Sequence, residues 1–144
     1  MHENIYGIVA PMVTPFRADG TIDEGALREE TGYLIEGAKV HGLAVCGSTG
    51  EGHTLSTDET KRITAIVSEV AAGRVPVITG IIADSTAAVI ERGRAVREYG
   101  VAALQVTPVH YVFRPDDDAM VRHFADIAAA TELPILIYNV VPWT

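Results

Sequence analysis

The stretch Leu43–Ser56, LAVCGSTGEGHTLS, joins a short apolar run to a loop with three glycines and then to a helix-start signal. The run Leu43–Cys46 is apolar without a two-residue alternation, which is typical of a strand buried on both faces. Ser56 is followed three residues later by Glu59, and this capping-box pattern indicates the start of a helix. The stretch therefore predicts a strand, a glycine-rich loop and a helix, which together form one βα unit.

The same unit recurs along the chain at intervals of roughly 30 residues. Four more apolar runs predict buried strands: Ile5–Val13, Val75–Gly80, Ala102–Thr107 and Pro134–Asn139. Each gap between strands holds a helical pattern with apolar residues spaced by threes, fours and sevens. The first and last predicted helices are marked by the apolar patterns Leu27, Leu34, Ile35 and Ala38, and Val121, Phe124, Ala125 and Ala128. The second begins at Ser56 and stops at Gly73, and the third has a cap at Asp84-Ser85 and a stop at Gly100. Consecutive βα units imply parallel strands joined by right-handed crossovers.

Two α/β architectures are built from such units: the open doubly wound sheet and the closed (β/α)8 barrel. Five strands would complete an open sheet within 144 residues, whereas a barrel needs about 250 residues and eight strands. Length therefore favours the open sheet. The first loop, Pro11–Gly20, argues against it, because the loop lacks a glycine-rich phosphate fingerprint and instead predicts a hairpin around Arg17–Asp23, RADGTID.

The composition is that of an ordinary globular domain, with 48% hydrophobic and 21% charged residues. A net charge of −8 and a pI near 5.0 argue against nucleic acid as a partner. No targeting pattern opens the sequence and no segment approaches the roughly 20 apolar residues that span a bilayer, so no membrane contact is expected. Cys46 is the only cysteine, which excludes a disulfide framework and favours a cytoplasmic protein.

No metal site is expected, because the sequence lacks both HExxH-type and cysteine-based ligand spacing. Cys46 is expected to fill core space. His53 and His123 are expected at the surface or at helix caps. The acidic run Asp116–Asp118 falls at a predicted helix start, where its charges complement the helix dipole.

The glycine-rich loop is the chemical centre of the sequence. Gly47 and Gly50 permit positive φ angles, which can turn successive N–H groups inward as an anion-binding nest. Ser48 and Thr49 add hydroxyl donors, so the loop is predicted to hold a small carboxylate; a purely structural turn is the alternative. The glycine spacing matches no dinucleotide fingerprint and no lysine follows it as in a P-loop, which argues against nucleotide binding.

Two further strand ends carry groups that can move protons. The fourth strand leads to His110 and Tyr111, and the fifth leads to Tyr138. Because the carboxyl ends of parallel strands meet at one edge of a sheet, these side chains are expected to share a pocket with Ser48 or Thr49. The alternative for each aromatic ring is packing in the core.

Four motifs occupy the predicted strand ends: VAPMVTPF at Val9–Phe16, GSTGE at Gly47–Glu51, VTP at Val106–Pro108 and YNV at Tyr138–Val140. In this order they resemble the dihydrodipicolinate synthase and N-acetylneuraminate lyase family of pyruvate-dependent class I aldolases. The resemblance implies a (β/α)8 barrel, usually a homotetramer, and outweighs the argument from length. Residues 1–144 would then be the N-terminal part of a single barrel domain, covering about its first five βα units.

The resemblance also implies roles for individual residues. Ser48 and Thr49 match the hydroxyl pair that holds the carboxylate of a 2-oxo acid such as pyruvate, with Gly47 and Gly50 shaping the same loop. Tyr138 matches the tyrosine that lies beside the Schiff base, poised by Ser48, and shuttles protons as both donor and acceptor. No cofactor is implied.

Three departures from the family pattern shape the functional prediction. The family's imine-forming lysine ends the sixth strand, and Lys39 and Lys61 both fall in predicted helices, so the catalytic lysine is expected outside this chain. The second relay aromatic matches His110 in a gapless reading, or Tyr111 if the loop is longer. Val141–Trp143 stands where the synthases carry an arginine for the second substrate's carboxylate.

The sequence therefore predicts a Schiff-base-forming lyase or aldolase that acts on pyruvate or a related 2-oxo acid and an aldehyde. An aldolase, hydratase-aldolase or dehydratase is preferred to a synthase. The alternative is a non-catalytic half-barrel, or a five-stranded open-sheet domain, that binds a small carboxylate or only assembles.

Overall fold

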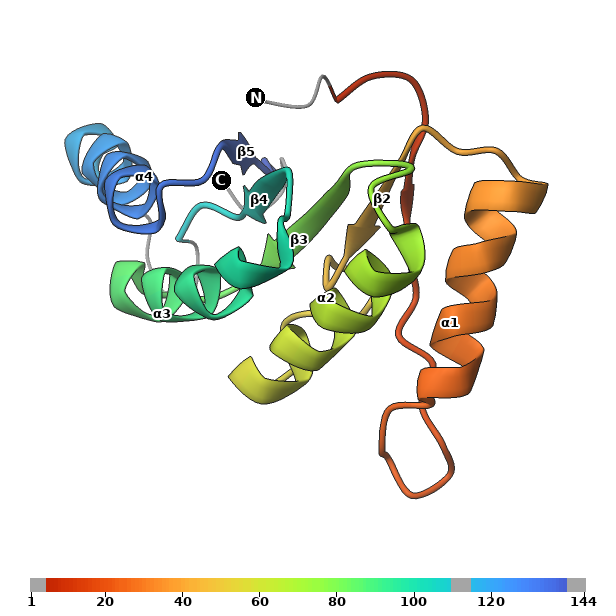
Figure 1. The fold of residues 1–144 in the computed structure, drawn as a ribbon. Coiled ribbons are helices and arrows are strands. Elements are labelled where there is room, and N and C mark those ends of the chain that lie inside the picture. The colour runs from red at the N-terminus through yellow and green to blue at the C-terminus, as the bar shows by residue number, and fades with distance from the viewer. Residues whose placement is uncertain (1–4, 110–114, 140–144) are drawn as a thin grey trace.

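The computed structural model describes residues 5–109 and 115–139, and in these ranges strands alternate with helices along the chain (Figure 1). The strands are β1 (Val9–Pro11), β2 (Gly42–Val45), β3 (Val77–Ile81), β4 (Ala103–Val106) and β5 (Ile135–Ile137). The helices are α1 (Glu24–Gly32), α2 (Thr57–Ala71), α3 (Thr86–Val96) and α4 (Asp117–Thr131). A π-helical turn η1 (Tyr33–Gly37) continues α1, and a 3₁₀ turn η2 (Arg97–Tyr99) continues α3.

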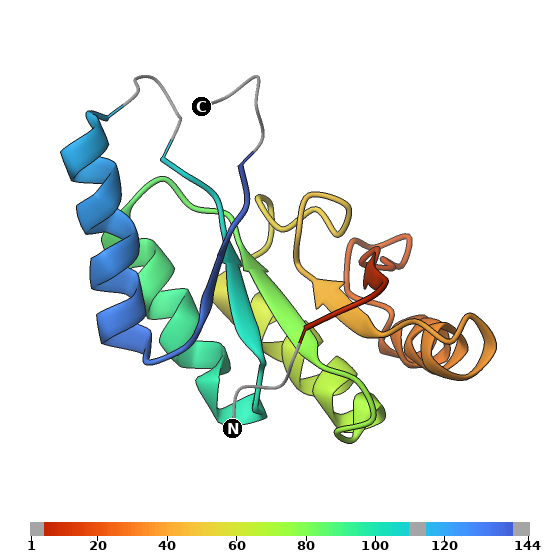
Figure 2. The ribbon, with the colours of Figure 1, turned by 90° about the horizontal axis from the view of Figure 1, so that it is seen from above.

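The five strands form one parallel sheet in the order β1-β2-β3-β4-β5. A doubly wound sheet reverses its strand order part-way and carries helices on both faces. Here the order is sequential, and α1 to α4 follow one another along a single side of the sheet (Figure 2). This is the arrangement of a (β/α)8 barrel, and it excludes the doubly wound alternative that chain length favoured.

The strand register assigns side chains to two faces. The paired residues Leu43 and Val77, and then Thr79 and Leu104, lie on what we call the outer face, against the helices. Two-residue alternation places Ala44, Ile78, Gln105 and Leu136 on the opposite side, which we call the inner face.

The outer face is buried in two hydrophobic clusters. The first joins β2 to α1 and α2, through Leu43, Val45, Leu27, Ile63, Ile66 and Val67. The second joins β3 and β4 to α3 and α4, through Ile81, Leu104, Val106, Val89, Val96 and Ile127. The helices therefore fix the sheet from outside and leave the strand ends and the inner face for chemistry.

The local signals at the helix starts are confirmed. The N–H of Ser56 donates to Oε2 of Glu59 at 2.8 Å, and the N–H of Glu59 donates back to Oγ of Ser56 at 3.2 Å, which completes the predicted capping box. Ser85 caps α3 by accepting the N–H of Ala88, and Asp116 caps α4 by accepting the N–H of Ala119. The Arg17–Asp23 hairpin is confirmed as well, with Phe16 and Ile22 bridged in antiparallel fashion.

Most strand boundaries differ by one or two residues from the prediction, and three further differences have a conformational cause. The first strand is only Val9–Pro11, because Gly7 at a φ of +68° interrupts the extended chain before it. Helix α2 ends at Ala71, because Ala72 already takes the left-handed conformation, at a φ of +48°. Lys39 lies beyond η1 with a φ of +56°, not in a helix, whereas Lys61 is in α2 as predicted.

No helix in the described part of the chain is long and apolar enough to cross a bilayer.

Candidate active site

The GSTGE loop leaves the carboxyl end of β2 and is tied down by backbone hydrogen bonds. The N–H groups of Gly50 and Gly52 both donate to the carbonyl of Gly47, at 3.1 and 3.0 Å. Oγ1 of Thr14 donates to the carbonyl of Gly50 at 2.7 Å, which fastens the loop to the segment after β1. The VAPMVTPF motif thus holds the GSTGE motif in place.

The conformational role predicted for Gly47 and Gly50 is wrong, since neither has a positive φ. The left-handed positions of this loop are Cys46, at +55°, and Glu51, at +56°. Gly50 and Gly52 are needed instead because other backbone atoms lie too close for a side chain. A Cβ on Gly50 would lie 2.9 Å from the carbonyl oxygen of Met12, and one on Gly52 would overlap the carbonyl of Cys46.

A further glycine, which the sequence analysis did not single out, supports the same loop from β3. A Cβ on Gly80 would lie 2.6 Å from the carbonyl oxygen of Cys46 and 2.8 Å from Cα of Gly47. The loop backbone therefore packs directly on β3 at this point. The available signal was a glycine at the end of a predicted strand, because a glycine in a strand often marks close approach of another backbone.

Thr49 and Tyr138 line one cavity of about 420 Å³ on the inner face. Tyr138 follows β5, and its N–H donates to the carbonyl of Val106 at 2.8 Å, so the neighbouring strand β4 holds its backbone. Ser48 is exposed beside Thr49 but does not line this cavity. The structure thus brings two of the predicted site residues together from β2 and β5, which are not adjacent in the sheet.

The donors of the loop are available for a ligand. Within residues 5–109 and 115–139, the N–H groups and hydroxyls of Ser48 and Thr49 donate to no protein acceptor, and neither does the phenol of Tyr138. Backbone N–H groups together with hydroxyls can hold a carboxylate by charge-assisted hydrogen bonds. The predicted contact between Ser48 and Tyr138 is not formed in this structure.

Gln105 was missed by the sequence analysis. It lies on β4, lines the same cavity as Thr49 and Tyr138, and has its Oε1 3.9 Å from the position that a Cβ on Gly47 would take. The signal was a polar residue between apolar neighbours in the run Ala102–Thr107. His110 and Tyr111, the two candidates for the second relay position, lie outside the described residues.

The cysteine and the two histidines considered in the sequence do not line the cavity. Cys46 is buried as predicted, and burial raises the pKa of its thiol to about 12, so it is no nucleophile. His53 is exposed, as expected. His123 corrects the expectation of a surface or cap position: it is buried between α4 and α3, with Nδ1 2.9 Å from Oγ1 of Thr86, and burial lowers its pKa. No group of three potential metal ligands gathers among the described residues.

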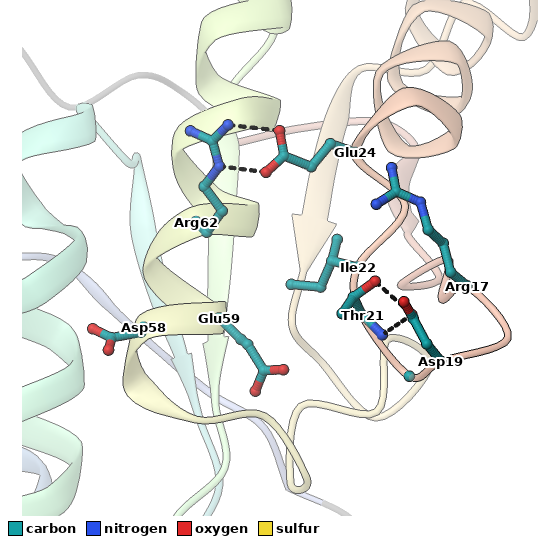
Figure 3. Close-up of a pocket in the computed structure, with 9 residues that line it drawn as sticks. Arg17, Asp19, Thr21, Ile22, Glu24, Asp58, Glu59 and Arg62 are labelled. Atoms are coloured by element: carbon teal, nitrogen blue, oxygen red, sulfur yellow. Dashed lines mark hydrogen bonds and ion pairs between the residues drawn. The ribbon is translucent and has the colours of Figure 1, made fainter.

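A larger cavity of about 730 Å³ lies between the Arg17–Asp23 hairpin and the start of α2 (Figure 3). Its charged lining residues are Asp19, Glu24, Asp58, Glu59, Arg17 and Arg62. Arg62 donates to both carboxylate oxygens of Glu24, at 2.7 and 2.6 Å, and lowers the pKa of that carboxyl. With this arginine engaged and carboxylates in excess, the cavity is a poor site for a 2-oxo acid.

The fold and the site define a class: parallel strands in sequential order, as in a (β/α)8 barrel, with a hydroxyl-bearing loop over an inner cavity. The chain belongs to the dihydrodipicolinate synthetase family, whose model matches residues 4–144. The 4-hydroxy-tetrahydrodipicolinate synthase of Thermomicrobium roseum is 47% identical over 135 residues, which cover 93% of this chain and 43% of that protein. The chain therefore spans less than half the length of the relatives it matches.

Solved structures agree with the family assignment. The CdNal protein of Clostridium difficile, in complex with mannosamine, has a TM-score of 0.92 and 27% identity, covering 99% of this chain and 49% of that one. The 4-hydroxy-tetrahydrodipicolinate synthase of Methylacidiphilum fumariolicum SolV has a TM-score of 0.90 and 32% identity, covering 97% and 46%. These neighbours are (β/α)8 barrels, which confirms the predicted fold class.

Proposed function

We propose that this chain supplies the part of a Schiff-base-forming lyase or aldolase that binds pyruvate or a related 2-oxo acid, the partner substrate being an aldehyde. Residues 1–144 form the N-terminal part of one barrel domain, and the imine-forming lysine lies outside them. The protein works without a cofactor, as a homotetramer in the cytoplasm. Family membership and the single buried cysteine support these points.

The observation that carries the proposal is the shared cavity of Thr49 and Tyr138. These residues come from strands that are not adjacent, so their meeting at one cavity is a property of the fold and not of local sequence. Thr49 offers an unused N–H and hydroxyl, and Tyr138 offers an unused phenol, and both residues line the same cavity. This pairing suits a ligand with a carboxylate at one end and a reacting carbon at the other.

Each residue then has a defined task. Ser48 and Thr49 donate hydrogen bonds to the carboxylate of the 2-oxo acid and orient its carbonyl carbon. Imine formation and carbon–carbon bond cleavage both require proton transfers, and the Tyr138 phenol can give and take a proton within the cavity. The glycines at 50, 52 and 80 keep the loop close enough to the inner face for the two tasks to meet.

The test is an intact mass of the natural polypeptide after incubation with pyruvate and borohydride, which reduces an imine to a stable adduct. A mass well above 15.4 kDa with a pyruvate-derived adduct supports the proposal. A chain of 15.4 kDa without adduct overturns it and favours a half-barrel that only binds or assembles.

Loop variants separate carboxylate binding from loop shape. Ser48→Ala and Thr49→Ala should each raise the pyruvate concentration needed for half-maximal trapping by roughly tenfold, the cost of a hydrogen bond to a charged group. Thr54→Ala is the matched control, because its hydroxyl donates to Glu51 outside the cavity. Unchanged pyruvate dependence in both loop variants would argue against the carboxylate role.

Tyr138→Phe tests the proton step. Removal of the phenol oxygen should leave the pyruvate concentration for half-maximal trapping nearly unchanged while slowing turnover by about 10²-fold or more. If the variant loses its fold instead, as judged by circular dichroism, the ring is a packing residue and the relay role fails.

A further inference from the structure

His123 is a buried imidazole on the helix side of the sheet, outside the candidate site. The residue is 4% exposed, and its Nδ1 lies 2.9 Å from Oγ1 of Thr86 at the start of α3. The other ring nitrogen, Nε2, is enclosed and has no hydrogen-bond partner among the described residues. A buried polar atom without a partner is costly, so its presence between two helices requires a specific reason.

The neighbour of this imidazole at the sheet is Thr107, the residue that follows β4. The carbonyl of Thr107 lies close enough to the ring to oppose the lowering of the pKa of His123 by burial. Thr107 is itself 4% exposed, and its hydroxyl is enclosed without a partner in the described ranges, as Nε2 is. The two enclosed polar groups therefore belong to neighbouring residues, one on α4 and one at the carboxyl end of β4.

A neutral imidazole can connect Thr86 to Thr107, because it accepts through one nitrogen and donates through the other. A carbonyl can only accept, so the carbonyl of Thr107 favours a proton on the nitrogen that is not engaged by Thr86. Nδ1 then accepts from the Thr86 hydroxyl, and Nε2 carries the hydrogen that is available to Thr107. Thr86 thus fixes the orientation of the ring.

Thr107 is one peptide group away from the backbone of the candidate site. The carbonyl of Val106 accepts the N–H of Tyr138 at 2.8 Å, and because the Val106–Thr107 peptide is planar, the orientations of this carbonyl and of Thr107 are coupled. The loop of Thr49 is fastened separately, through the hydroxyl of Thr14. A shift of Thr107 should therefore move Tyr138 and leave the carboxylate donors in place.

We infer that His123 is a positioning residue: it fixes Thr107 at the carboxyl end of β4 and thereby sets the place of the Tyr138 phenol. The inference rests on the proposed function and adds to it a residue outside the cavity that acts on the proton step. His123 touches no substrate. Its effect reaches the site through the backbone of β4 and β5.

The test follows the exchange of the methyl protons of pyruvate for deuterium in D₂O, by NMR, with the natural polypeptide. The pyruvate imine loses a proton from its methyl carbon to give an enamine, and a deuteron returns to the same carbon, so this measurement needs no aldehyde. Thr86→Val keeps the shape of the side chain and removes the hydroxyl, so the exchange rate at saturating pyruvate should fall about tenfold. The pyruvate concentration for half-maximal exchange should be nearly unchanged, and Thr86→Ser, which restores the hydroxyl, should restore the rate.

Two substitutions of the imidazole sharpen the test. The carboxamide of His123→Gln extends to the place of Nε2, whereas that of His123→Asn ends near Nδ1 and keeps only the contact with Thr86. The glutamine variant should therefore exchange faster than the asparagine variant. If Thr86→Val does not fold, this comparison decides, and equal rates in the two His123 variants would contradict the inference.

Thr131→Val is the matched control. It removes another buried hydroxyl of α4, one that donates to the carbonyl of Ile127 further along the helix, and should leave the exchange rate as in the wild type. If Thr86→Val exchanges at the wild-type rate, or if Thr131→Val slows exchange as much, the inference is wrong while exchange by the wild type leaves the proposed function intact. If the wild type neither exchanges nor traps pyruvate, the proposed function fails and the inference fails with it.

Discussion

The two faces of the sheet differ in how far the described residues cover them. The outer face is covered by four helices, and its strand residues are apolar except for Thr79, whose hydroxyl pairs with that of Thr64 in α2 at 3.2 Å. The inner face is only partly covered in the described chain: Leu136 there is 38% exposed, and Gln105 has no protein partner among the described residues. Among the described residues, the hydrophobic clusters therefore lie on the outer face and the candidate site lies on the inner face.

Truncation of the outer face should have the largest effect. Leu104 is fully buried between β4 and the helices α3 and α4, so Leu104→Ala should lower the free energy of unfolding by about 2–5 kcal/mol. Val121→Ala, on the exposed surface of α4, removes apolar atoms that are already in contact with water and should change stability little. Urea unfolding of both variants measures the contrast, and equal losses would mean that the outer face is not the main core.

A methyl group at Gly80 should cost less but affect both faces. Gly80→Ala forces a Cβ to within 2.6 Å of the Cys46 carbonyl oxygen, and such overpacking costs typically about 1–3 kcal/mol. Because the strained backbone leads into the GSTGE loop, pyruvate trapping should weaken as well. Gly32→Ala is the control, since nothing lies within 4 Å of a Cβ at the last residue of α1.

The contrast between the faces also explains what the sequence could predict. The capping box at Ser56, the strand–loop–helix repeat and the order of the motifs are local patterns, and the structure reproduces them. The reason for the glycines could not be read locally, because it depends on how closely the loop packs against the segment after β1 and against β3. The burial of His123 and the place of Gln105 likewise follow from which elements become neighbours.

The capping box at the start of α2 should have a smaller, purely local effect. Ser56→Ala removes a hydroxyl that accepts the N–H of Glu59, and loss of such a cap costs about 1 kcal/mol. Ser85→Ala removes a single capping bond at the start of α3, and should cost less than Ser56→Ala, which also removes the bond that Oγ of Ser56 donates to Oε2 of Glu59 at 2.8 Å. Thermal unfolding of the two variants ranks them, and the opposite ranking would mean that the second bond of the Ser56 hydroxyl adds nothing to the cap.

The smallest expected effect is a change in the pH dependence of stability, and it concerns His123, a titratable side chain buried among the helices. Burial holds the pKa of His123 below its ordinary value, opposed by the carbonyl of Thr107 and the charge of Asp126. Below the unfolded pKa of about 6.5, the unfolded chain therefore takes up a proton that the folded chain resists. The free energy of unfolding should be greatest above that pH and should fall as the pH drops through it.

Urea unfolding between about pH 7 and pH 5 isolates this contribution, because carboxyl groups titrate mainly below that window. His123→Asn keeps a hydrogen-bonding group near Oγ1 of Thr86 and removes the titration, so its stability should depend less on pH than that of the wild type. His53→Gln, which removes an exposed imidazole, is the matched control. An unchanged slope in His123→Asn would mean that the buried imidazole does not couple protonation to folding, and that the helix side of the sheet contributes to stability through packing alone.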